Sequence, residues 1–332
     1  MPNAVSMGGA SLARPATDRI SFKEFSDLPE YSSYYGPSGI TVGPDKALWV
    51  TDDIDQDFGE SAVVRVLPSG RQAHTFYYQG LSTEGSDLLG IATGSDGALW
   101  ITDTYNGQIL RLTTSGNYTG FRLSRYASPV DITSGPDRAL WFTASVGSTS
   151  EVGRITTSGN ITTTGVGKGA QGITVGPDRA LWFCETGIDQ IGRITTHDKV
   201  TSYSKGITPG SGPTSIAAGP DGALWFTERT GGRIGRITTS GKVTEYSHGI
   251  SGNEQPFGIA AGPDGAMWFT EYATYNSYGA ANSKIGRITM SGKISEYAKI
   301  NPTSGPTSIV EGAKGDLWFV ETDADKTGRV QL

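Results

Sequence analysis

The sequence predicts an all-β fold: a seven-bladed β-propeller of four-stranded antiparallel blades, closed by an N-terminal strand that completes the last blade. The first observation is a decapeptide, GPDGALWFTE from Gly219, that returns in near-copies along the chain. The second is that successive tryptophans are 41–51 residues apart, which is the length of one four-stranded blade. All seven stand at one position of this repeat: Trp49, Trp100, Trp141, Trp182, Trp225, Trp268 and Trp318.

Each repeat contains four short β-like runs. Between Thr214 and Ser247 they read TSIAAG, ALWFTE, RIGRIT and KVTEYS, with GPDG and TTSG between them. Apolar and polar residues alternate in these runs, as in half-buried strands, and Gly, Pro and Asp are typical of tight turns. One blade cannot bury both of its faces alone, so neighbouring blades must stack and the ring must close.

The two ends of the chain provide the third observation. The last repeat stops at TGRVQL, its third strand, and the missing fourth strand matches ISFKEFSDL from Ile20. Glu24 and Phe25 stand there in the places of Glu245 and Tyr246. We therefore expect residues 20–28 to pair beside residues 327–332, within a single domain over 20–332. Residues 1–19 are predicted to be a disordered lead or an artificial remnant.

Composition limits the possible partners. The net charge of −6 and the absence of any basic run argue against nucleic acid and anionic membranes as partners. No apolar run approaches the roughly 18 residues of a membrane span, so we expect a soluble protein, cytoplasmic or secreted with its signal removed. One cysteine allows no disulfide within the chain. We expect a monomer that needs no cofactor and no metal.

Variation between the repeats indicates where a site would lie. The start of the first strand and the end of the second share one face of a propeller, and the tripeptides at the first position differ between repeats. Their middle residues should surround the mouth of the central channel, and we call them the mouth ring: Ser38, Leu89, Val130, Gln171, Thr214, Phe257 and Thr307. These residues are mostly apolar or hydroxylic, which suits a neutral organic ligand better than a metal.

Other residues near the mouth also depart from the repeat. Asp131 stands where the other repeats have Gly or Ser, so its carboxylate is either a functional base or a cap on neighbouring amides. The insertion EYATYNSYGAANSK in the sixth repeat carries three tyrosines that either contact a ligand or pack along the rim: Tyr272, Tyr275 and Tyr278. Tyr35, just before the first tripeptide, joins the predicted ligand contacts.

Two other sets of residues are interpreted as structural. An acid follows the tryptophan by three residues in six repeats, and this repetition predicts pairing with the blade's own arginine or with loop amides. These acids are Asp52, Asp103, Glu185, Glu228, Glu271 and Glu321. The three histidines, His74, His197 and His248, fall in or beside the predicted outer strands and their turns, and we expect them on the surface.

The sequences GPDGALWFTE and IGRITTSGKVTEY and the P-x-G-I tripeptides resemble the streptogramin B lyase (virginiamycin B lyase) family over residues 20–332. The resemblance implies the same propeller and a pocket at its mouth. Members of this family open the ester ring of a cyclic depsipeptide antibiotic by magnesium-assisted elimination. The resemblance implies a catalytic histidine in a P-H-G-I tripeptide, a second histidine in a P-H-x-I tripeptide, and glutamates that hold the metal.

The chain departs from this pattern at the positions that matter for the chemistry. By the resemblance, Phe257 and Thr307 stand at the histidine positions, and Gly305 and Gln255 stand where a metal glutamate is expected. Glu321 is the nearest candidate for the other glutamate, and Tyr272 matches an aromatic residue over the ligand. The resemblance therefore implies the fold and the place of the pocket more than it implies magnesium chemistry.

Two classes of function follow. In the first, the protein is an enzyme that acts on a bulky natural product or cyclic peptide, by metal-independent elimination with Asp131 or Tyr272 as base, or by a cyclisation guided by shape and hydrogen bonds. In the second, it is a propeller that binds a small molecule or peptide without turnover. In both classes we expect the ligand at the mouth ring.

Overall fold

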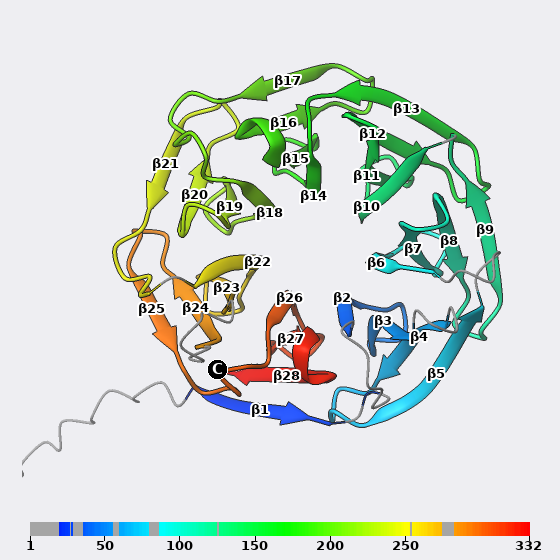
Figure 1. Ribbon diagram of the computed structural model, residues 1–332, viewed down its shortest axis with the longest axis horizontal. Coiled ribbons are helices and arrows are strands. Elements are labelled where there is room, and N and C mark those ends of the chain that lie inside the picture. Colours follow the sequence, from blue (N-terminus) through cyan, green and yellow to red (C-terminus); the bar gives the residue numbers. More distant parts are fainter. Residues whose placement is uncertain are drawn as a thin grey trace, which may run out of the picture.

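The computed structural model describes residues 20–26, 28, 36–55, 60–79, 86–124, 126–252, 254–273 and 282–332. Within these ranges the chain forms seven four-stranded antiparallel sheets in a ring, as Figure 1 shows. This confirms the predicted seven-bladed propeller. Between the gaps in these ranges, no helix is long and apolar enough to cross a membrane.

Each blade is numbered from its innermost strand to its outermost. The first four blades are β2 (Pro37–Val42), β3 (Leu48–Asp55), β4 (Glu60–Val66) and β5 (Gln72–Gln79); β6 (Leu88–Thr93), β7 (Leu99–Asp103), β8 (Gln108–Leu112) and β9 (Tyr118–Arg122); β10 (Ala127–Ser134), β11 (Leu140–Val146), β12 (Thr149–Ile155) and β13 (Ile161–Val166); and β14 (Ala170–Val175), β15 (Leu181–Glu185), β16 (Gln190–Ile194) and β17 (Val200–Tyr203).

The last three blades follow the same order. They are β18 (Pro213–Ala218), β19 (Leu224–Glu228), β20 (Arg233–Ile237) and β21 (Val243–Tyr246); β22 (Gln255–Ala261), β23 (Met267–Tyr272), β24 (Lys284–Ile288) and β25 (Ile294–Tyr297); and β26 (Pro306–Glu311), β27 (Leu317–Glu321), β28 (Lys326–Gln331) and β1 (Ser21–Phe25). Two short 3-10 helices, η1 (Thr186–Ile188) and η2 (Thr322–Ala324), follow β15 and β27.

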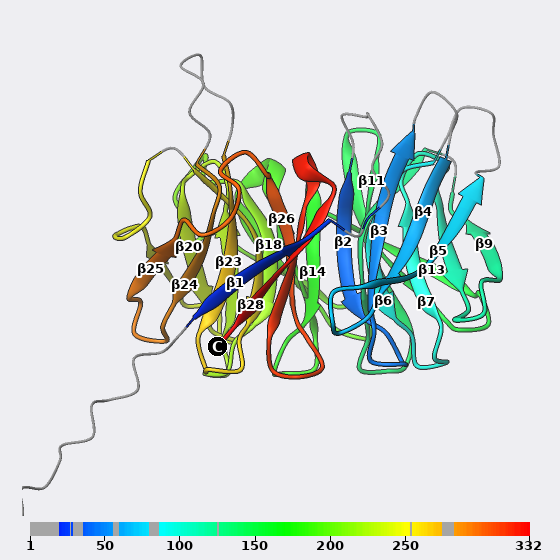
Figure 2. The same ribbon diagram turned by 90° about the horizontal axis from the view of Figure 1, so that it is seen from below.

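The ring closes as predicted, because β1 is the outermost strand of the last blade. It pairs with β28 from Ser21 opposite Gln331 to Phe25 opposite Thr327. Figure 2 shows the two strands side by side on the outside of the ring. The chain therefore joins its first strand to its last, and the seventh sheet needs both.

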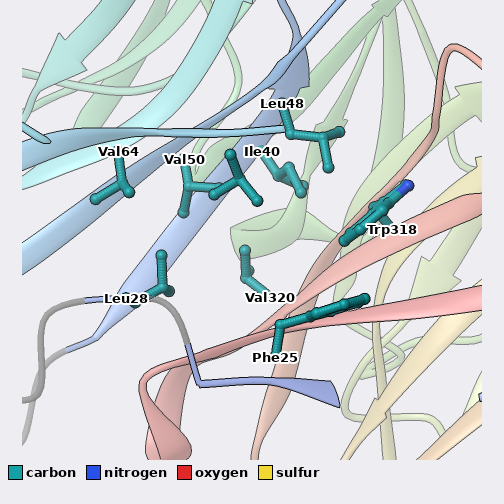
Figure 3. Packing of buried hydrophobic residues seen from close by; sticks show 9 residues of the cluster. Phe25, Leu28, Ile40, Leu48, Val50, Val64, Trp318 and Val320 are labelled. Atoms are coloured by element: carbon teal, nitrogen blue, oxygen red, sulfur yellow. The ribbon is translucent and has the colours of Figure 1, made fainter. Parts of the chain in front are cut away.

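Apolar clusters fill the seams between blades. At the closing seam, Phe25 stacks on Trp318 with ring centroids 5.2 Å apart, and both pack against residues of the first blade such as Val50 and Val64 (Figure 3). A comparable cluster of buried residues lies between every other pair of neighbouring blades in the described ranges. Each tryptophan is at most 1% exposed, so the repeated apolar residues serve the packing of blade on blade.

The polar part of the decapeptide fixes the tryptophan. In the fifth blade, one carboxylate oxygen of Asp221 accepts the Trp225 indole N–H at 3.1 Å, and the other accepts the Arg236 Nε–H at 2.7 Å. Although burial alone would raise the pKa of Asp221, these bonds hold it below its usual value. Five other turns repeat the arrangement, at Asp45, Asp96, Asp137, Asp178 and Asp264.

This network corrects one expectation. The arginine was assigned to the acid that follows the tryptophan, but it pairs with the turn aspartate before the tryptophan instead. The expected loop amides are found in two cases: Glu185 accepts the Gly167 N–H at 2.7 Å, and Asp103 accepts the Asn106 N–H at 3.2 Å. The repeated decapeptide is thus the framework of the ring.

Candidate functional site

The mouth ring surrounds one cavity of about 250 Å³. In every blade a β-bulge interrupts the pairing of the innermost strand at the middle residue of its tripeptide. Such bulges re-aim side chains. The seven residues that the structure brings together on the cavity wall are Ser38, Leu89, Val130, Gln171, Thr214, Phe257 and Thr307.

Threonine hydroxyls connect neighbouring blades at this ring. Thr51 Oγ1 donates to the carbonyl of Leu89 in the next blade at 2.7 Å. The same bond recurs from Thr102 to Val130, Thr143 to Gln171, Thr227 to Phe257 and Thr270 to Thr307. These bonds fix the backbone of the ring and leave its side chains free to differ.

Two blades lack a threonine at this position and use another one. Cys184 and Val320 replace it in the fourth and seventh blades. There a threonine two residues later donates to the proline carbonyl of the next blade, from Thr186 to Pro213, and from Thr322 to Pro37 at 2.7 Å. Thr322 also lines the cavity. The backbone of the mouth is therefore tied across these two seams as well.

Asp131 lines the cavity and bridges two blades. Its Oδ2 accepts the N–H of Ile173 in the fourth blade at 2.9 Å, and its Oδ1 accepts the N–H of Ile132 at 2.8 Å. Burial raises the pKa of Asp131 to about 6, although both amide bonds favour the carboxylate. The geometry gives Asp131 the capping role considered above, and a pKa near 6 also leaves it ionised at neutral pH.

Phe257 and Tyr272 form an aromatic pair at the mouth. Phe257 is on β22 and Tyr272 ends β23, and their ring centroids lie 6.4 Å apart. The Tyr272 hydroxyl donates to Asp323 Oδ1 at 3.3 Å. Burial and the bond to Asp323 raise the pKa of Tyr272, and the charge of Arg229 opposes them in part. The phenol therefore stays protonated at neutral pH, which favours a role as hydrogen-bond donor over that of base.

Sequence analysis missed Arg229, which adjoins this pair. Its guanidinium carbon lies 4.8 Å from the Phe257 ring centroid and 6.0 Å from that of Tyr272, and its Nε donates to Gln255 Oε1 at 2.8 Å. Arg229 stands four residues after Trp225. The same position is Asp, Thr, Ser or Tyr in the other blades, so the comparison that singled out Asp131 would have found it.

The donor atoms at the positions that the resemblance relates to magnesium do not fit that ion. The Gln255 amide oxygen accepts from the guanidinium of Arg229, so a cation already occupies its side. Phe257 carries no donor atom, and Gly305 carries no side chain. The Glu321 carboxyl is fully buried, and burial raises its pKa to about 7. A carboxyl that retains a proton near neutral pH is a poor magnesium ligand.

Other acids at the ends of second strands are enclosed in the same way. Glu228 and Glu271 are fully buried, and burial, together with a neighbouring glutamate, raises their pKa to about 8 and about 9. Neither lines the mouth cavity. They belong to the framework, as their repetition predicted.

The remaining predicted residues lie elsewhere. His74, on β5, and His197 and His248, in turns, are exposed as expected, and none of them lines the mouth cavity. Tyr35, Tyr275 and Tyr278 lie outside the described residues, as do residues 1–19. Their predicted contacts stay predictions.

Comparisons with known proteins agree with this architecture. The family model described as the virginiamycin B lyase family matches residues 23–168 and 163–277. Among solved structures, a catalytically inactive variant of virginiamycin B lyase from Staphylococcus aureus with quinupristin is 34% identical, with a TM-score of 0.80 over 95% of this chain and 100% of that one. A streptogramin B lyase structure is 32% identical, with a TM-score of 0.79 over 94% and 98%. No curated protein matches the chain in sequence.

Proposed function

Because the chain belongs to the virginiamycin B lyase family, we propose that it binds a bulky, largely neutral natural product or cyclic peptide at the mouth cavity. We propose further that it converts this ligand by metal-independent elimination or by a cyclisation guided by shape. The observation that carries the proposal is the mouth ring: seven positions that vary between blades line one cavity, while the rest of each blade repeats. A relative of the same fold has been solved with quinupristin.

Two residues can serve the elimination. A base removes a proton from the carbon next to the one that carries the leaving oxygen, a carbon–carbon double bond forms, the carbon–oxygen bond breaks, and the leaving oxygen gains a proton. Asp131, with its pKa of about 6, is the candidate base, and Tyr272 is the candidate donor to the leaving oxygen. They stand on the third and sixth blades, so the substrate would have to be bulky to contact both.

A second candidate function is binding without turnover. It is favoured by the two backbone N–H groups that already occupy the carboxylate oxygens of Asp131. In that case the cavity selects a ligand by shape and polarity alone. The same cavity serves both functions, so they are separated by the effect of Asp131 on turnover.

Replacing either aromatic residue tests the site. Phe257→Ala and Tyr272→Ala are each expected to weaken binding roughly 30- to 1000-fold, since truncating a buried aromatic contact costs about 2–4 kcal/mol. The neutral fluorophore N-phenyl-1-naphthylamine is a suitable probe, titrated by its fluorescence. His248→Ala, an exposed change, is the control and should leave the affinity unchanged. If His248→Ala lost binding and both aromatic variants kept it, the mouth would be the wrong site.

Asp131→Asn separates the two functions on the same protein. With quinupristin as the test substrate and mass spectrometry as the readout, this variant should reduce turnover far more than binding if Asp131 is the base. Turnover by the native protein that survives the change would leave shape-guided chemistry. No turnover of any natural product tested would leave binding alone.

Chelation is expected to have no effect. Gln255, Phe257 and Gly305 offer no set of donors for magnesium, so EDTA should leave both probe binding and any turnover intact. The measurement compares each before and after dialysis against EDTA, and again after magnesium is added. A turnover that EDTA abolishes and magnesium restores would show that the metal ligands lie elsewhere in the chain.

A further inference from the structure

A second cavity adjoins the mouth at Arg229. It measures about 430 Å³, and its wall is polar, with Arg229, Glu254 and Gln255 among its lining residues. The loops that form it follow β19 and precede β22, so it lies between the fifth and sixth blades. The guanidinium of Arg229 also stacks on Phe257, which lines the mouth cavity. Arg229 therefore stands where the two cavities meet.

Arg229 differs in its partners from the arginines of the framework. Arg236, for example, pairs with Asp221 at 2.7 Å. Arg229 is half-buried, and within the described ranges no carboxylate lies within ion-pair distance of it. Its described hydrogen bond uses Nε alone. The terminal N–H groups of the guanidinium are thus the donors left for a ligand.

The acid in the same cavity is already engaged. Glu254 Oε1 lies 3.4 Å from Lys284 Nζ and accepts from Asn282 Nδ2 at 3.1 Å. The unpaired charge on the cavity wall is therefore the positive one. A guanidinium presents its N–H groups as a planar fork that matches two oxygens of an anionic group.

We propose that Arg229 binds an anionic oxygen group of the ligand, of the carboxylate class, while the apolar body of the same ligand lies against Phe257 in the mouth cavity. The inference rests on the proposed function and deepens it. The ligand class becomes a bulky apolar molecule with one anionic group at its edge. The stacking of Arg229 on Phe257 couples the two contacts, because one side chain orients the other.

Two fluorophores of similar shape test the inference. 8-Anilinonaphthalene-1-sulfonate carries one anionic oxygen group, and N-phenyl-1-naphthylamine has the same aromatic body without it. Arg229→Gln is expected to weaken binding of the sulfonate about 10- to 100-fold, the effect of losing a charge-assisted bidentate contact, and to change binding of the neutral probe less than about twofold. Arg71→Gln, an exposed change in the turn between β4 and β5 on the opposite face of the ring, should change neither.

Three further measurements make the result decisive. Circular dichroism checks that each variant is folded, and on the native protein, added salt should weaken the sulfonate and spare the neutral probe. Equal losses for both probes in Arg229→Gln would overturn the anion site, because Arg229 would then only position Phe257. Phe257→Ala should weaken both probes. If it weakened neither while Arg229→Gln still weakened the sulfonate, the anion site would stand and the proposed function at the mouth would fail.

Discussion

Deleting residues 1–28 is expected to prevent formation of the closed ring, whereas deleting residues 1–17 should leave the melting temperature unchanged. The longer deletion removes β1 and with it the five residue pairs to β28. It also removes Phe25 and Leu28, which are 7% and 4% exposed in the cluster of the closing seam. Loss of two such side chains costs on the order of 5 kcal/mol or more, which is comparable to the total stability of many domains.

The shorter deletion is the matched control, because it keeps every contact of β1. Among these is the bond from the Asn301 N–H to Glu24 at 2.6 Å. Thermal unfolding followed by circular dichroism compares both proteins with the full chain. Equal melting temperatures for the two deletions would contradict the role of β1 in closing the ring. Phe25→Ala, which removes the stack on Trp318 but keeps the strand, should fall between them.

Stability should decline as the pH rises from about 5 to 9, and Glu271→Gln should remove a large part of that decline. Burial, with Glu296 close by, raises the pKa of Glu271 from 4.5 to about 9, and Lys284 opposes the shift only in part. Between these two values the folded protein binds a proton that the unfolded chain has lost. Stability therefore falls with pH across this window. Each pKa unit corresponds to about 1.4 kcal/mol, so the group contributes several kcal/mol.

The side-chain amide that Glu271→Gln introduces mimics the protonated acid and carries no charge at any pH. The variant should accordingly melt higher than the native protein at pH 8–9 and close to it at pH 5. Glu311→Gln, on an exposed position of β26, is the control and should leave the pH profile unchanged. A residual slope from Glu228 is expected, since its pKa is also raised, to about 8. A Glu271→Gln protein that melts lower at pH 9 than the native protein would contradict the prediction.

Most of the fold could be predicted because the repeat records it many times. Tryptophan spacing gave the number of blades, and the unfinished last repeat gave the strand that closes the ring. The assignment of the arginines could not be made, because both acids lie close to the tryptophan in sequence. Only the register, which sets Trp225 opposite Arg236, brings that guanidinium to Asp221 in the turn.

The positions of the candidate site were also readable, from where the repeats differ. Phe257 and Asp131 were singled out in this way, but Arg229 was not, because the end of the second strand was compared for its acids alone. The two amide bonds of Asp131 could not be foreseen either. One of them comes from Ile173 in the neighbouring blade, and contacts between blades leave no mark in the spacing of residues within one.

The sequence by itself determined the ring of seven blades, its closure by residues near Ile20 and the face on which variation gathers. It could do so because turns, alternation and a fixed period are local properties that are written out in every repeat. Only the tertiary structure decided which charges are paired. The guanidinium of Arg229 rests on Phe257 and the carboxyl of Glu271 is enclosed, because burial and partners depend on neighbours that are distant in the chain.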